Sequence, residues 1–197
     1  MYVFDTKPVR FYFYKKKHMI QSVDIRLMLP EDLDTLYKIS RDAYSLNFGH
    51  HWEEGGLAEY MDKVFSRELL AAELAAPAIH YYVAFVDQKP VAFMKLNLHS
   101  NLPGANPEKG IELDKLYILP DQKGLGIGRQ FVELAFRVAA ATGKETFWLA
   151  VIDTNTAAMA FYEKAGFRRH STMRVGYPKF REDLKGMWRM TADLTGR

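Results

Sequence analysis

Three glycines that alternate with single residues form the part of the sequence with the most definite chemistry. Gly124, Gly126 and Gly128 follow a β-rich run and lead into a helical pattern. Glycine lets the backbone turn tightly and approach a ligand closely, and the first turn of a helix offers free N–H groups and a partial positive charge. With the charges of Lys123 and Arg129 beside it, this turn predicts a cradle for phosphate groups.

The spacing of these glycines distinguishes the turn from two other phosphate-binding motifs. The dinucleotide-binding pattern G-x-G-x-x-G requires glycine at position 129, where the chain has arginine. The P-loop pattern G-x-x-x-x-G-K-[ST] is absent. A glycine turn that joins a strand to a helix and binds no ligand remains the alternative.

A second segment, residues 155–167, reads NTAAMAFYEKAGF and begins about 30 residues after the glycine turn. Its order of Asn, Ala, Phe-Tyr and Lys-x-Gly-Phe resembles the second signature of the GNAT N-acetyltransferase superfamily. The first signature of that family is [RQ]-x-x-G-x-[GA], and residues 123–128 match it except that Lys123 replaces Arg or Gln. The resemblance extends from about residue 23 to residue 194. Residues 167–187 are similar, more narrowly, to bacterial spermidine/spermine-type acetyltransferases.

The resemblance implies a fold, a co-substrate and an acceptor. The expected fold is a single α/β (α+β) domain, with a mixed, mostly antiparallel twisted sheet of about seven strands and about four flanking helices. This domain would occupy residues 23–197 behind an N-terminal extension, residues 1–22. Acetyl-CoA is the implied co-substrate, and a primary amine of a polyamine or another small molecule is the implied acceptor. The cofactor contacts implied by the family are Leu116, Tyr117 and Ile118 for the pantetheine arm and acetyl group, Lys123, Gly124, Leu125, Gly126, Ile127, Gly128 and Arg129 for the pyrophosphate, and Asn155 for the pantetheine region.

Acetyl transfer to an amine needs a base, a carbonyl hydrogen-bond donor and an acid. Alkyl amines have a pKa of ~10.4, so only about one molecule in a thousand is unprotonated at neutral pH. We expect Glu112 to act as the base through water, with Asp114 as its rival, because period-two alternation would place both on the face of Leu116 and Ile118. The N–H near Ile118 would stabilise the carbonyl oxygen. Tyr162, near the thioester sulfur by family resemblance, is the expected acid; the alternative is a tyrosine packed on the apolar face of its helix.

The acceptor pocket should come from the first two helices and the loop between them. Trp52 and Tyr60 offer ring faces to a cation, and Glu53 and Glu54 offer charge. The alternative is an ordinary capped loop with a packed tryptophan. Adjacent histidines, 50 and 51, do not point together and no further ligand cluster accompanies them, so we expect no metal.

The pattern of apolar residues, turn residues and glycines predicts the elements that position these groups. The expected strands are 23–29, 80–86, 91–98, 111–119, 145–152, 167–175 and 187–194, and the expected helices begin near 33 and cover 57–75, 129–142 and 156–164.

Composition narrows the classes of function. The chain has 197 residues, 48% hydrophobic and 26% charged, with a net charge of +3 and no cysteine. Disulfide frameworks, thiolate metal sites and cysteine nucleophiles are therefore excluded. The charge does not demand nucleic acid, no window is apolar enough for a membrane span, and charged residues interrupt the apolar runs near the N-terminus, so we expect a cytoplasmic protein. The aromatic stretch 2–14 and the last two strands could pair between chains, which makes a homodimer possible. A protein N-terminal or lysine acetyltransferase and a non-catalytic acetyl-CoA-binding module remain the alternative functions.

Overall fold

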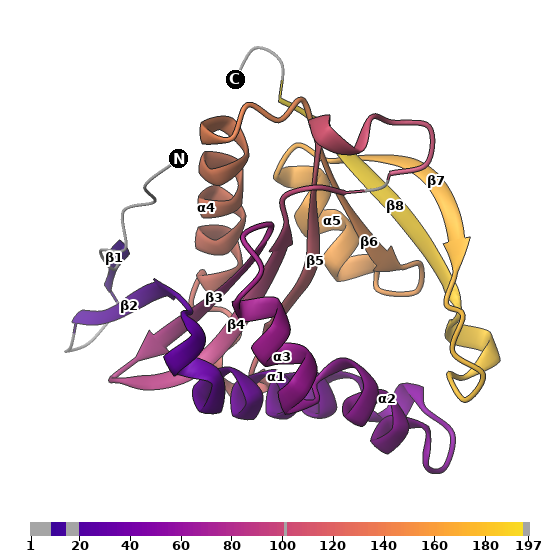
Figure 1. The fold of residues 1–197 in the computed structure, drawn as a ribbon, viewed down its shortest axis with the longest axis horizontal. Coiled ribbons are helices and arrows are strands. Elements are labelled where there is room, and N and C mark those ends of the chain that lie inside the picture. The colour runs from indigo at the N-terminus through magenta and orange to yellow at the C-terminus, as the bar shows by residue number, and fades with distance from the viewer. Residues whose placement is uncertain (1–8, 15–19, 101, 195–197) are drawn as a thin grey trace.

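A twisted sheet of eight strands is the framework of the protein in the computed structural model, which describes residues 9–14, 20–100 and 102–194 (Figure 1). The strands run in the order β1-β2-β3-β4-β5-β6-β8-β7. Only β5 and β6 are parallel; every other neighbouring pair is antiparallel. The predicted mixed, mostly antiparallel sheet is confirmed. The strands are β1 Val9–Tyr14, β2 Ile20–Leu27, β3 Ile79–Val86, β4 Lys89–Asn97, β5 Gly110–Ile118, β6 Thr146–Ile152, β7 Arg168–Arg174 and β8 Gly186–Asp193.

The strand beyond the expected seven comes from the expected N-terminal extension. Strand β1 pairs antiparallel with β2, with Val9 opposite Ile25. It is one edge of the sheet, and β7 is the other. The charge run at 15–18 and the start of the aromatic stretch lie outside the described residues. Association through these edges stays a prediction.

The described residues form five α-helices where about four were expected. They are α1 Leu33–Phe48, α2 Gly56–Val64, α3 Arg67–Leu74, α4 Ile127–Ala141 and α5 Thr156–Lys164. The single helix expected over 57–75 is two helices. Phe65 leaves the helical conformation with φ −127°, and the Ser66 side chain accepts a hydrogen bond from the Leu69 N–H at 3.2 Å, so Ser66 caps a new helix. No described helix is both long and apolar enough to span a membrane.

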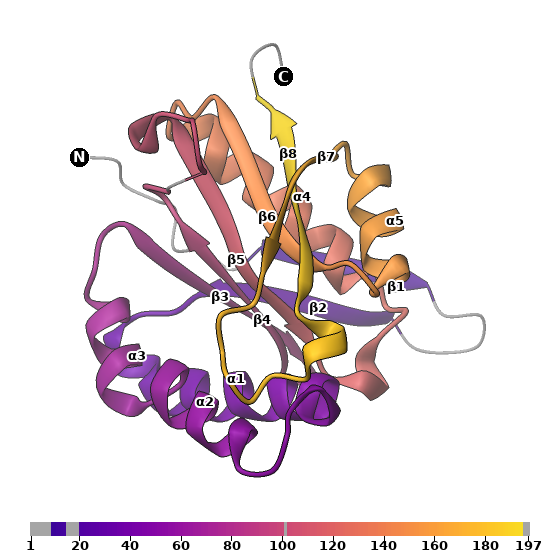
Figure 2. The same cartoon turned by 90° about the vertical axis from the view of Figure 1, so that its right-hand side faces the viewer.

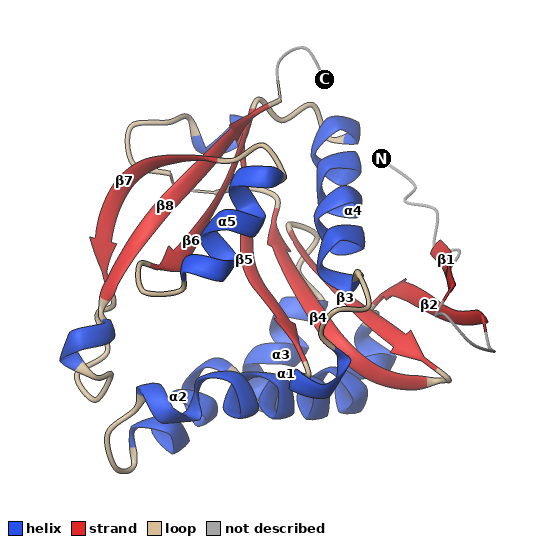
Figure 3. Ribbon diagram, turned by 180° about the vertical axis from the view of Figure 1, so that it is seen from behind, coloured by secondary structure: helices blue, strands red, loops and turns tan. Residues whose placement is uncertain are grey.

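The helices cover both faces of the sheet (Figures 1 and 3). Helices α4 and α5 enclose one hydrophobic core, which includes Phe131 and Met159, and α1, α2 and α3 enclose the other, which includes Leu36 and Phe65. Strands β3 and β4 are buried on both sides because they lie between the two layers. The cores are thereby separated by the sheet that carries the site.

Strands β5 and β6 are paired for only part of their length. Their register runs from Gly110 opposite Thr146 to Leu113 opposite Leu149 and then stops. On the other side, β5 stays paired with β4 as far as Ile118. The two parallel strands therefore diverge after Leu113, and the sheet opens between them.

A β-bulge at Asp114 lies where the strands diverge. Lys95 of β4 is opposite Lys115 and Leu96 is opposite Leu113, so Asp114 has no partner. One extra residue reverses the alternation of side chains beyond it. Leu113 and Leu116 consequently face the same core, and Tyr117 faces the other. The expectation that Glu112 shares a face with Leu116 and Ile118 is therefore wrong, because unbroken alternation was assumed.

The loop between β7 and β8, residues 175–185, reaches across to the loop between α1 and α2 (Figure 2). Arg181 N–H donates to the His51 carbonyl at 2.9 Å, and Glu53 N–H donates to the Lys179 carbonyl at 2.9 Å. An antiparallel bridge joins Trp52 to Phe180. Segments more than 120 residues apart along the chain are thus held together over the gap in the sheet.

Candidate active site

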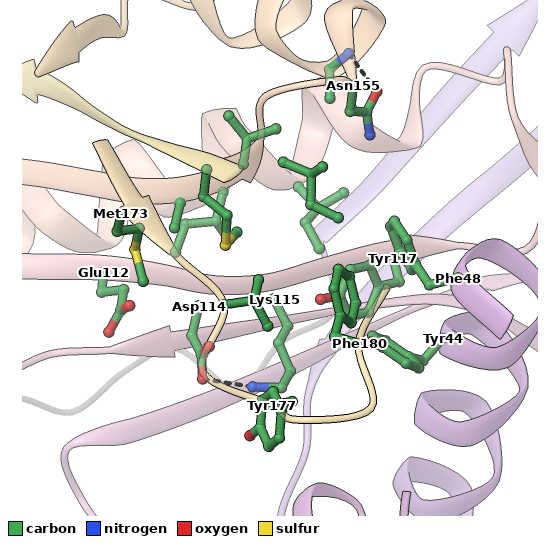
Figure 4. A pocket seen from close by; sticks show the side chains of 18 of the residues that line it. Tyr44, Phe48, Glu112, Asp114, Lys115, Tyr117, Asn155, Met173, Tyr177 and Phe180 are labelled. Carbon is green, nitrogen blue, oxygen red and sulfur yellow. Dashed lines mark hydrogen bonds and ion pairs between the residues drawn. The ribbon is translucent and has the colours of Figure 1, made fainter. Parts of the chain in front are cut away.

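A pocket of about 320 Å³ occupies the gap between β5 and β6 (Figure 4). Its walls come from β5, the end of β6, the start of α5, the α1–α2 region and the β7–β8 loop. Of the residues expected in the site, those that line it are Glu112, Leu116, Tyr117, Asn155, Tyr162, Trp52 and Tyr60. The gap thus brings together groups from both ends of the chain.

The divergence leaves main-chain groups of β5 without a strand partner. Leu119 N–H donates to the Val91 carbonyl at 2.9 Å. Because alternate residues of an antiparallel pair point their polar groups toward the partner, Leu116 and Ile118 point theirs away from β4 and into the gap. The Ile118 carbonyl accepts a hydrogen bond from Asn47 Nδ2 at 2.8 Å. The N–H groups of Leu116 and Ile118 remain as donors beside the pocket.

The glycine turn adopts the conformation that only glycine reaches easily. Gly124 has φ +82° and Gly126, which caps α4, has φ +74°. Among the described residues, no hydrogen bond uses the N–H groups of residues 124–129. A glycine turn with six free amides at the start of a 15-residue helix is a suitable anion cradle.

An open groove of about 840 Å³ lies beside this turn, between α4 and α5. Arg129, Arg137 and Lys164 contribute positive charge to it, and Phe136 and Phe161 contribute aromatic surface. Arg129 also forms an ion pair with Glu133, Nε to Oε1 2.7 Å. The groove therefore continues the positive character of the turn.

Helix α5 presents two of the expected residues to the pocket. Asn155 is its N-cap, with Oδ1 accepting from the Ala158 N–H at 3.1 Å. Tyr162 is half-buried, and its ring contacts Phe161 and Phe167 with centroid distances of 5.1 and 5.8 Å. Burial raises the pKa of Tyr162 above its ordinary value of 10.0, so its phenol stays protonated at neutral pH. The side chain thus both packs in the core and lines the pocket.

Two carboxyl groups of β5 line the pocket, and their surroundings move their pKa values apart. Burial raises the pKa of Glu112, the charge of Asp114 raises it further, and a hydrogen bond from Asn97 Nδ2 to Oε2 at 2.8 Å partly opposes this. Burial would also raise the pKa of Asp114, but the ammonium groups of Lys115 and Lys95 outweigh burial and lower it to about 2. Glu112 is therefore the carboxylate of the two that binds a proton more readily than an ordinary glutamate.

Asp114 and its partners form a buried network of ion pairs. Lys115 Nζ lies 2.8 Å and Lys95 Nζ 3.0 Å from Asp114 Oδ2. Lys95 continues to Glu73 of α3 at 2.6 Å, and Glu73 accepts a hydrogen bond from the Tyr81 hydroxyl. Both lysine side chains are less than 10% exposed, at 8% and 9%. This network of ion pairs connects the bulge to the layer of helices that includes α3.

Aromatic rings form the opposite end of the pocket. Tyr44 and Phe48 of α1, Trp52 and Tyr60 line it from the first two helices and their loop. Figure 4 shows Tyr44, Phe48 and Tyr117 grouped at one end, away from Glu112. The β7–β8 loop adds the rings Tyr177 and Phe180.

The sequence predicted only part of the pocket lining at this end. Glu53 and Glu54 are exposed and do not line the pocket. Tyr44 and Phe48 were not predicted to line it, although their spacing of four residues on an apolar helix face was a usable signal. Tyr177 and Phe180 carry no local signal, because their position depends on a contact with the distant α1–α2 loop.

The rings of the adjacent histidines, His50 and His51, pack against each other and against neighbouring aromatic rings. The rings of His50 and His51 are 4.3 Å apart, and that of His51 also contacts Phe48 and Phe180. Burial, followed by the charge of His50, lowers the pKa of His51. Within the described part of the chain, no three His, Cys, Asp or Glu side chains gather as metal ligands would.

Known proteins resemble this chain in sequence and in fold. The family model described as acetyltransferase (GNAT) family matches residues 33–167. Spermidine N(1)-acetyltransferase of Thermoplasma acidophilum is 25% identical over 155 residues, which cover 77% of this chain and 91% of that protein. The crystal structure of PaiA N-acetyltransferase from Thermoplasma acidophilum in complex with coenzyme A has a TM-score of 0.70 and 22% identity, covering 87% of this chain and 98% of that one. The ribosomal-protein-S18-alanine N-acetyltransferase from Escherichia coli has a TM-score of 0.63 and 21% identity, covering 87% and 94%.

The pKa of Glu112 is raised and that of Asp114 is lowered. Replacing each carboxyl group by the matching amide should therefore change stability in opposite directions. Glu112 has a raised pKa, so its ionised form costs stability as pH rises above its ordinary value of 4.5. Glu112→Gln should therefore raise the melting temperature at pH 7 by a few degrees, about one kcal/mol, and the gain should vanish in acid.

Asp114→Asn should do the reverse. The carboxylate contributes stability above its ordinary pKa of 3.8, and that contribution is lost as pH falls toward about 2. Removing it leaves two buried ammonium groups without their shared anion and should cost on the order of 3 kcal/mol at pH 7. Thermal unfolding of both variants between pH 4 and 8 checks the signs; equal shifts in one direction would contradict the assignment.

Proposed function

The chain belongs to the acetyltransferase (GNAT) family, and on that premise we propose that it moves an acetyl group from acetyl-CoA to the primary amine of a small molecule. The chain is an acetyl-CoA-dependent N-acetyltransferase by family. The single observation that carries the proposal about the acceptor is the pocket in the gap between β5 and β6, which is closed over by the β7–β8 loop. Such a covered pocket favours a small acceptor over an extended protein segment.

The residues that would hold acetyl-CoA are those with unpaired polar groups. The amides of residues 124–129, with Lys123 and Arg129, would bind the pyrophosphate. The basic and aromatic groove between α4 and α5 would take the adenosine end. The free N–H groups of Leu116 and Ile118, with Asn155, would bind the amide-containing pantetheine arm, much as a neighbouring strand would.

Glu112 would act as the base. In the reaction the amine nitrogen forms a bond to the acetyl carbon, the carbon–sulfur bond breaks, and one proton leaves the nitrogen. Glu112 would receive this proton through a chain of waters, because it lies six residues along β5 from Ile118, a separation of ~20 Å. Its pKa is raised, whereas Asp114 is held ionised by two lysines and is a weaker base. The Ile118 N–H is the proposed donor to the carbonyl oxygen as negative charge develops on it.

Tyr162 would act as the acid. It lines the pocket, and the half-buried phenol carries its proton throughout the neutral range. It would donate that proton to the departing thiolate. Release of free thiol from acetyl-CoA, measured with a panel of primary amines, tests the whole proposal; coenzyme A binding without thiol release for any amine would contradict it.

Two glycines in the same conformation allow a matched test of the phosphate cradle. Gly124 and Gly104 both have φ +82°, and a Cβ at either position would meet no atom within 4 Å. Gly124→Ala and Gly104→Ala should each cost about 1–2 kcal/mol of stability through backbone strain. Only Gly124→Ala should weaken coenzyme A binding, by about tenfold. Isothermal titration calorimetry checks this, and equal affinities of the two variants would remove the turn from the site.

The role of Tyr162 can be separated from coenzyme binding. Tyr162→Phe should lower kcat by roughly a hundredfold, the contribution typical of a general acid, with little change in the affinity for acetyl-CoA. Tyr82→Phe is the control, because Tyr82 is also buried but lies outside the pocket. If Tyr162→Phe turns over at the wild-type rate, another group or water supplies the proton.

The raised pKa of Glu112 predicts the shape of the pH profile. Below that pKa, both Glu112 and the acceptor amine must lose a proton, so log kcat/KM should rise with a slope of about two; above it the slope should be about one. Glu112→Gln should show the slope of about one throughout, at a lower rate. If the change of slope appears at the same pH in the unmodified protein and in Glu112→Gln, a group other than Glu112 causes it.

A further inference from the structure

Five aromatic side chains that line the pocket form what we call the aromatic box: Tyr44, Trp52, Tyr60, Tyr177 and Phe180. The rings of Tyr44 and Tyr60 are stacked at 4.6 Å, and that of Trp52 lies 4.8 Å from Tyr60. The ring of Tyr177 meets Tyr60 edge-on at 5.0 Å, and that of Phe180 meets Trp52 edge-on at 5.0 Å. These spacings are those of favourable aromatic pairs.

Two polar groups of the box form a hydrogen bond with each other. Trp52 Nε1 donates to the Tyr44 hydroxyl at 3.2 Å. Tyr44, Tyr60 and Phe180 are buried, with 5%, 9% and 4% of their surface exposed. The box therefore presents mainly ring surface to whatever enters it.

The charges around the pocket leave little negative charge for a polycation. Asp114 is neutralised by Lys115 and Lys95, and Lys95 also pairs with Glu73. Two carboxylates and two ammonium groups sum to zero, so Glu112 is the one carboxylate of the described pocket lining without an ion-pair partner. A polyamine needs further carboxylates for its distal ammonium groups, because a buried unpaired charge is costly.

The box is already assembled, because the β7–β8 loop is fastened to the first two helices. Two main-chain hydrogen bonds and the Trp52–Phe180 bridge join the loops. Lys179 adds an ion pair to Glu59 of α2. Pre-assembly lowers the entropy cost of binding a ligand against the rings.

We propose that the aromatic box selects an acceptor with one amino group on a short chain and an aromatic body, an arylalkylamine, in preference to a polyamine. This inference rests on the proposed function. The aryl group would lie against the rings, and the amine would lie in the gap between β5 and β6, where the N–H groups of Leu116 and Ile118 would hold the acetyl group. The pocket volume of about 320 Å³, which must also admit the acetyl group, limits the acceptor to a small molecule of this kind.

The test compares three primary amines with the intact protein and acetyl-CoA: 2-phenylethylamine, hexylamine and spermidine, each at equal concentration of unprotonated amine. We expect kcat/KM for 2-phenylethylamine to exceed the values for both others by about tenfold or more. Spermidine turned over equally well or better would overturn the inference and leave acetyl transfer to amines standing. No thiol release with any amine, with coenzyme A bound in calorimetry, would overturn the proposed function and this inference together.

Two substitutions at Tyr177 test whether the ring itself matters. Tyr177→Phe keeps the ring and should retain the preference for the aryl substrate. Tyr177→Leu has an apolar side chain without a ring, and it should raise KM for 2-phenylethylamine by about tenfold while changing that for acetyl-CoA little. Equal preference in the two variants would overturn the role of the box, and the comparison of amines with the unmodified protein does not depend on how either variant folds.

Discussion

The divergence of β5 and β6 is the constraint on which the rest of the structure depends. Neighbouring strands in a sheet normally satisfy each other's polar groups, but here pairing stops at Leu113 and Leu149. The bulge at Asp114 accompanies that change. Main-chain donors are thereby left for a ligand, and the gap becomes a pocket because helices and a loop cover it on both sides. The gap in the sheet is therefore the place where we propose that acetyl transfer occurs.

The bulge also decides the electrostatics. It places Asp114 beside two buried lysines, while Glu112 lies on the face opposite Ile111 and Leu113. One carboxylate is consequently fixed as an anion within a structural network, while the other is held where ionisation is costly. Two carboxyl groups two residues apart on one strand are thus held in opposite protonation tendencies, and we propose that only Glu112 takes part in the chemistry.

The aromatic end of the pocket is formed by residues that are far apart in the sequence. Its rings come from α1, the α1–α2 loop, α2 and the β7–β8 loop, which lie at opposite ends of the sequence. Aromatic residues at such sites give shape and ring surface without charge, and the buried charges nearby cancel. The selectivity of the protein for its acceptor would then depend mainly on shape and ring contacts rather than on the number of acidic side chains in the pocket.

The sequence by itself determined most element boundaries and the glycine turn, because those features depend on local periodicity, helix caps and glycine conformations. The mixed sheet and the expected site positions of Tyr162 and Asn155 came from the resemblance to the GNAT family. The sequence also predicted Trp52 and Tyr60 as site residues, and both line the pocket. Only the tertiary structure decided that Glu112 faces away from Leu116, that Glu53 and Glu54 stay in solvent, and that Tyr177 and Phe180 close the pocket. The physical reason is that a bulge depends on the partner strand, and a contact between residues 52 and 180 depends on the packing of the whole chain, neither of which is written in neighbouring residues.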